Sequence, residues 1–94
     1  MIEWTEQAIR QLDQAHDYIA LSNSEEVADR ITMHIVASVQ MLASFPMSGR
    51  VGRVSGTREL VISTTSIIAV YTIDGNRIAI LVVYHGAQQW PDVL

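Results

Sequence analysis

Three short apolar segments in the second half of the chain set the strongest limit on its fold. They cover residues 58–63, 66–73 and 77–84 and are rich in β-branched side chains, which favour extended, pleated strands. Between the last two segments lies Asp74-Gly75-Asn76, a sequence typical of a tight hairpin turn. We therefore predict consecutive antiparallel strands. Because these strands are strongly apolar, the rest of the chain must cover one face of the sheet.

The first half of the chain has the pattern of two helices. Apolar residues recur at helical spacing from residue 8 to residue 20, and Thr5 is a suitable N-cap for this first helix. A polar break follows at residues 21–24, and a second helix, capped by Ser22 or Ser24, is predicted to reach residue 43 or 44. Pro46 ends it, because the residue before a proline is disfavoured in the helical conformation.

These elements predict one α+β domain over residues 1–94. The alternating residues 2–4 form a short first strand, and residues 46–57, with three glycines and a proline, form a loop with tight turns. The predicted order is β-α-α-β-β-β, with an antiparallel sheet packed on a helical hairpin. The short break between the helices makes them antiparallel neighbours.

Composition excludes several classes of site. The chain has no cysteine, so disulfides, thiolate metal sites and cysteine nucleophiles are excluded. Its three histidines are far apart in sequence and have no recognisable metal-ligand spacing, so neither a metal nor a cofactor is predicted. The first residues lack the features of a signal peptide, and no apolar stretch approaches the roughly 20 residues of a membrane span. A soluble, cytoplasmic protein is expected.

The charges are unevenly placed. The net charge is −4, all six basic residues are arginines, and residues 1–30 alone carry seven acids against two arginines. So acidic a chain is a poor general binder of nucleic acid, which requires a basic surface. Arg50, Arg53 and Arg58 either form a recognition cluster, for which arginine is suited, or are basic by chance in a chain that happens to lack lysine.

Four segments resemble the RelE/ParE superfamily of bacterial toxins, in its ParE-like branch. They are the Phe-Pro-Met-Ser-Gly-Arg segment at 45–50, Gly-Thr-Arg-Glu-Leu at 56–60, Ile-Ala-Val-Tyr at 68–71 and the strand end at 82–91. They occur in the family's order and on the expected elements, and together they span nearly the whole chain. The resemblance implies the toxin of a type II toxin–antitoxin pair, held inactive by a small antitoxin.

Within this superfamily, RelE-like toxins cleave mRNA in the ribosomal A site, and ParE-like toxins poison DNA gyrase. A metal-independent ribonuclease needs a base, an acid and cations for the phosphate. His85, Arg58 and Tyr71 are the candidates here, with Tyr84 as the alternative to Tyr71. Against this mechanism, the chain has no lysine and a net negative charge, which disfavours docking on a ribosome.

Gyrase inhibition requires a binding surface rather than a catalytic set. Arginine and aromatic residues often dominate such surfaces, and the candidates are Arg50, Arg53, Arg58, Gln88 and Trp90. We therefore favour a gyrase inhibitor, with the ribosome-dependent ribonuclease as the alternative. An inactive homologue that only binds an antitoxin is a third possibility. The antitoxin is expected to be acidic or amphipathic, to contact the hairpin and the sheet edge, and to form a hetero-oligomer with the toxin.

Overall fold

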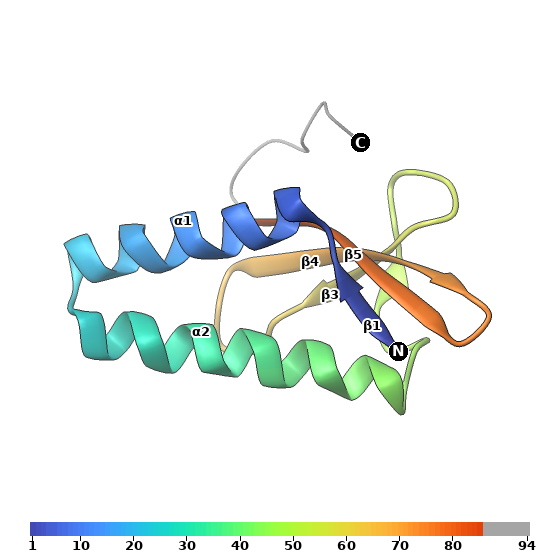
Figure 1. The fold of residues 1–94 in the computed structure, drawn as a ribbon, viewed down its shortest axis with the longest axis horizontal. Helices are drawn as coiled ribbons and strands as arrows, with labels where there is room; N and C mark the ends of the chain where they lie inside the picture. Colours follow the sequence, from blue (N-terminus) through green and yellow to red (C-terminus); the bar gives the residue numbers. More distant parts are fainter. Residues whose placement is uncertain (86–94) are drawn as a thin grey trace.

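The computed structural model describes residues 1–85 and has two helices packed on a five-stranded sheet (Figure 1). Helix α1 joins strand β1 to helix α2, a single 3-10 turn, η1, follows α2, and four further strands complete the sheet. The bounds are β1 Ile2–Trp4, α1 Glu6–Ser22, α2 Glu25–Gln40, η1 Met41–Ala43, β2 Arg50–Val51, β3 Arg58–Val61, β4 Ile67–Asp74 and β5 Arg77–His85.

The strand order in the sheet is β1-β5-β4-β3-β2. Strands β2 to β5 pair with their sequence neighbours in antiparallel fashion, and β1 pairs with β5 in parallel, with Ile2 opposite Ile78. The chain can make this parallel pair because the helical hairpin between β1 and the later strands serves as the long connection that parallel strands require. The two helices lie side by side over one face of the sheet (Figure 1).

The main core lies between the helices and the sheet. Its buried residues from the helical layer are Ala8, Ile35, Val39 and Leu42, and those from the sheet side include Ile67, Ala69, Tyr71, Ile80 and Val83. A second, smaller cluster on the other face of the sheet consists of Ile68, Val70, Val82 and Tyr84. Both faces of β4 and β5 are therefore buried, which explains why these strands are apolar throughout instead of alternating.

The predicted α+β fold is confirmed, with differences of detail. The segment predicted as a loop at 46–57 contains the short strand β2, which pairs with β3. The sheet is not wholly antiparallel, since β1 joins it in parallel. Ser24, rather than Ser22, caps α2 by accepting a hydrogen bond from the backbone N–H of Val27 at 3.1 Å. Arg50 and Val51 of β2 do not belong to an alternating apolar pattern. They form a strand only because they pair with Glu59 and Arg58 of β3.

A β-bulge in β5 links the sheet to the start of α1. Val70 is opposite Val82 but Tyr71 is opposite Ile80, so Leu81 is the extra residue. The Thr5 hydroxyl donates to the carbonyl oxygen of Leu81 at 3.0 Å and accepts from the N–H of Ala8 at 3.1 Å. Thr5 is thus both the N-cap of α1 and a link to β5.

Replacement of Thr5 by valine, which keeps the side-chain shape but removes the hydroxyl, is expected to lower the free energy of unfolding by about 2 kcal/mol. Ser24→Ala is the matched control, because the Ser24 hydroxyl caps α2 through one hydrogen bond at an exposed position. Its expected cost is about 1 kcal/mol. Urea denaturation followed by circular dichroism measures both, and equal costs would contradict a linking role for Thr5.

Neither helix within residues 1–85 combines the length and the apolar character that crossing a membrane requires.

Candidate functional site

The arginine-rich segment after α2 is organised around a buried carboxylate. Glu59 is 2% exposed, and its Oε1 accepts from Arg50 Nε at 3.0 Å and from Arg50 Nη2 at 2.9 Å. Its Oε2 accepts from the backbone N–H of Arg53 at 3.1 Å. A buried carboxylate is stable only when it is paired and hydrogen-bonded. Glu59 therefore holds β2 and the turn after it against β3.

Tyr71 holds the turn that precedes β2, from the face of the sheet opposite to that of Glu59. It is completely buried, its hydroxyl donates to the carbonyl oxygen of Pro46 at 2.7 Å, and it accepts from the N–H of Gly49 at 2.9 Å. Arg58 adds a third contact, because its Nη1 donates to the carbonyl oxygen of Gly49 at 2.8 Å. The chain between α2 and β2 is thus held by side chains of β3 and β4.

The three predicted arginines do not form a single cluster. Arg50 is opposite Glu59 and Arg58 is opposite Tyr71; since successive residues of a strand point to opposite faces, Arg50 and Arg58 lie on different sides of the sheet. Arg53 lies with Arg50, because its backbone N–H binds the same Glu59 carboxylate, and Glu59 is opposite Val70 on the face away from the helices. Two arginines therefore belong to one face and the third to the other.

The face that carries Arg58 has a shallow, open hollow. Its lining is mostly apolar and consists of Met47, Val51, Gly56, Thr57, Arg58 and Ile73. Met47 and Val51 of this lining are exposed, Val51 to 78%, and Phe45, two residues before Met47 in the chain, is exposed as well. An open hollow with an exposed apolar rim is suited to a protein surface rather than to a small molecule, which usually occupies a deep pocket.

The three candidate catalytic residues do not form one site, because His85 lies apart from Arg58 and Tyr71. Arg58 is opposite Tyr71 in the sheet, but His85 is opposite Ile67, four residues away along β4. At about 3.4 Å per residue this separates His85 from the other two by about 13 Å along the strand. The Tyr71 hydroxyl is also occupied by its two backbone partners. Of the five candidate target-binding residues, Gln88 and Trp90 lie outside the described residues.

Tyr84 cannot take the place of Tyr71 as a proton donor beside Arg58, because the two tyrosines lie on opposite faces of the sheet. It belongs to the apolar cluster on the opposite face of the sheet, and burial raises the pKa of its hydroxyl. The hydroxyl therefore stays protonated at neutral pH. In the strand register, His85 is opposite Ile67.

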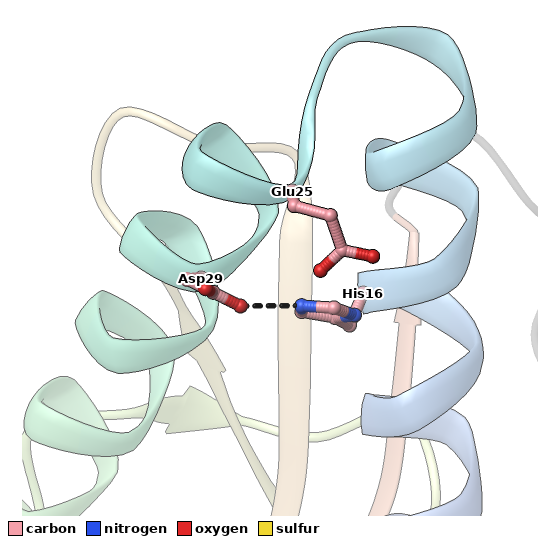
Figure 2. Close-up of side chains that lie close together, drawn as sticks. All are labelled: His16, Glu25 and Asp29. Atoms are coloured by element: carbon pink, nitrogen blue, oxygen red, sulfur yellow. Dashed lines mark hydrogen bonds and ion pairs between the residues drawn. The ribbon is translucent and has the colours of Figure 1, made fainter.

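A second group of polar residues, absent from the sequence-based predictions, lies between the helices near the turn that joins them. Figure 2 shows His16 of α1 facing Asp29 and Glu25 of α2. His16 Nε2 lies 2.7 Å from Asp29 Oδ1, and this hydrogen bond raises the pKa of His16. The only signal in the sequence is that Glu25 and Asp29, four residues apart, share one face of a helix; their proximity to His16 depends on the hairpin.

The fold and the arginine-rich segment define a small α+β toxin domain. The sequence profile of the family described as "ParE toxin of type II toxin-antitoxin system, parDE" matches residues 2–90. The chain belongs to this family of toxins.

Two relatives agree with this assignment. The toxin candidate Y4kP of Sinorhizobium fredii (strain NBRC 101917 / NGR234) is 42% identical over 93 residues, which cover 99% of this chain and 95% of the relative. A solved structure described as the chromosomal ParDE TA system from P. aeruginosa contains a chain that is similar with a TM-score of 0.82 and 27% identity. The match covers 89% of this chain and 92% of that one.

Proposed function

We propose that this type II toxin inhibits DNA gyrase by binding to it, and that a cognate antitoxin blocks this binding. The observation that supports a binding mechanism most directly is the separation of the ribonuclease candidates. His85 is about 13 Å along β4 from Arg58 and Tyr71, whereas proton transfer requires groups within hydrogen-bond reach of the reacting atoms.

The surface around β2 also supports this proposal. It combines exposed apolar side chains, Phe45, Met47 and Val51, with an arginine on each face of the sheet. Exposed apolar groups next to arginine are typical of protein–protein interfaces. The net charge of −4 works against close association with the ribosome, whose RNA is itself negatively charged.

The test is a paired assay with the purified full-length chain. It is added to gyrase in a supercoiling and DNA-cleavage assay, and separately to ribosomes programmed with a defined mRNA. Inhibition of gyrase with intact mRNA is expected. Codon-dependent cleavage of the mRNA with unaffected gyrase would overturn the proposal in favour of a ribonuclease. No response in either assay, together with harmless expression, would overturn it in favour of an inactive antitoxin-binding homologue.

Arg53→Ala is expected to weaken gyrase inhibition about tenfold, the effect of losing a moderate interface contact. Its backbone N–H, which holds Glu59, remains after the substitution, so the fold should be retained. His85→Ala is the matched comparison and is expected to change inhibition less than twofold. Dose–response curves in the supercoiling assay measure both, with thermal melts as the folding control. Loss of activity in His85→Ala alone would contradict the binding mechanism.

A further inference from the structure

The residues between the two helices have the composition of a metal site. His16, Glu25 and Asp29 each offer one ligand atom, and these three atoms all lie within 4.8 Å of one another. They come from both arms of the hairpin, near the turn that joins the helices (Figure 2). One imidazole nitrogen with two carboxylates is a donor set suited to Zn²⁺; Mg²⁺ and Ca²⁺ prefer oxygen ligands alone.

The imidazole ring is held in the orientation that such a site requires. Its Nε2 lies 2.7 Å from Asp29 Oδ1, and its Nδ1 lies 3.5 Å from Asp17 Oδ1. A histidine that binds a metal through one nitrogen usually has a carboxylate or a carbonyl near the other, which determines the tautomer and the ring orientation. The His16 side chain is only 23% exposed, so the packing of the hairpin also limits its rotation.

Carboxylates outnumber the imidazole at this position. His16 Nε2 lies 2.7 Å from Asp29 Oδ1, whereas Glu25 has no hydrogen bond or ion pair to any of residues 1–85 although its ligand atom lies within 4.8 Å of the other two. Asp17 adds a third carboxylate at 3.5 Å from the same ring. Three carboxylates thus lie around one imidazole, a local excess of negative charge that a divalent cation would neutralise.

The spacing requires only small adjustments to bind a metal. Zn²⁺ bonds to nitrogen and oxygen of about 2.0–2.1 Å place tetrahedral ligands about 3.3 Å apart. The present distance from His16 Nε2 to Asp29 Oδ1 is 2.7 Å, and the largest separation in the group is below 4.8 Å. Glu25 and Asp29 are exposed, so their side chains have room to rotate toward these positions.

We propose that His16, Glu25 and Asp29 form a Zn²⁺ site that cross-links the two helices, with water as the fourth ligand. This site does not depend on the proposed inhibition of gyrase, because it lies at the turn of the hairpin whereas the arginine-rich segment follows the far end of α2. Bound Zn²⁺ stabilises the folded state, because the three ligands are brought together only when the hairpin forms.

The experiment is equilibrium dialysis of the full-length chain against Zn²⁺ near neutral pH, with thermal melts at the same metal concentrations. One equivalent of Zn²⁺ is expected to bind, and the melting temperature is expected to rise with Zn²⁺ concentration and not with Mg²⁺. Glu25→Gln is the sharpest variant because Glu25 has no hydrogen bond or ion pair within residues 1–85, so its loss should not unfold the protein. Its Zn²⁺ affinity is expected to fall at least tenfold, and that of His16→Gln further.

Two further variants distinguish this site from general surface binding. Asp17→Asn, which removes a carboxylate beside Nδ1 without removing a ligand, is expected to lower the affinity about tenfold. His34→Gln is the matched control: His34 is also on a helix, but its Nε2 contacts the carbonyl oxygen of Ser63, and Zn²⁺ binding should be unchanged. The proposal is overturned if one equivalent does not bind, if Glu25→Gln and His16→Gln bind as tightly as the unmodified chain, or if Mg²⁺ competes equally.

Discussion

Replacement of Arg50 by methionine is expected to lower the free energy of unfolding by about 2–3 kcal/mol. The substitution leaves the Glu59 carboxylate buried, with the backbone N–H of Arg53 as its remaining hydrogen-bond donor. Breaking a buried ion pair by removing one partner typically costs about 3–5 kcal/mol. Here the Arg50 side chain is 54% exposed, so water weakens the pair and we expect a cost at or below the lower end of that range.

The same argument predicts an asymmetry that can be measured. Glu59→Gln removes the buried charge and leaves the exposed Arg50 in contact with water, so its cost should be smaller, about 1 kcal/mol. The double variant should be more stable than Arg50→Met alone, because no unpaired charge remains buried. Arg77→Met is the control for an exposed pair: Arg77 binds Glu3 at 2.7 Å with both side chains substantially exposed, and a loss below about 1 kcal/mol is expected.

Urea denaturation of the four variants tests these expectations. If Arg50→Met and Glu59→Gln lower the free energy of unfolding equally, the burial of the carboxylate does not account for the stabilising effect of the pair. If Arg77→Met costs as much as Arg50→Met, the two ion pairs would be equivalent in spite of their different exposure.

Replacement of Gly49 by alanine is expected to lower the free energy of unfolding by about 3 kcal/mol. A Cβ atom at this position would lie 2.5 Å from Tyr71 Oη, 2.7 Å from Tyr71 Cε1 and 3.0 Å from the carbonyl oxygen of Glu59. Overpacking of this kind costs about 1–3 kcal/mol. Displacement of the Tyr71 ring would also break its hydrogen bonds to Pro46 and Gly49, which adds about 1–2 kcal/mol.

Gly75→Ala separates this steric effect from the general effect of losing a glycine. Gly75 has a positive φ of 62°, and a Cβ there would meet no atom within 4 Å. Its expected cost is about 1 kcal/mol, from backbone strain alone. Tyr71→Phe combined with Gly49→Ala should cost less than the sum of the two single variants, since both act on one contact. Thermal and urea denaturation measure these costs; a loss at Gly49 no larger than at Gly75 would contradict the close packing around Tyr71.

The sequence was sufficient for the helices and the long strands because their signals are local. Thr5 and the apolar spacing after it place the start of α1 correctly, and the β-branched segments coincide with β3, β4 and β5 to within about two residues. The short strand β2 was missed because two residues contain no periodic signal. Its existence depends on the pairing of Arg50 with Glu59 and of Val51 with Arg58.

The candidate sites were predicted less well. Arg50, Arg53 and Arg58 were identified as residues of interest, but neither the burial of Glu59 nor the division of the arginines between two faces could be read from their spacing. The proximity of His16 to Asp29 was also missed, because these residues are 13 positions apart and meet only when the hairpin closes. The same holds for Tyr71 and Pro46, which are 25 positions apart.

The apolar pattern, the caps and the turn residues of this chain determine its secondary structure, because each of these signals acts over a few residues. The three apolar strand segments, in particular, already require a covered sheet. Only the tertiary structure shows that Glu59 is buried beneath Arg50, that His85 is remote from Arg58, and that His16 faces two carboxylates. These relations follow from strand register and helix pairing, which join residues distant in sequence.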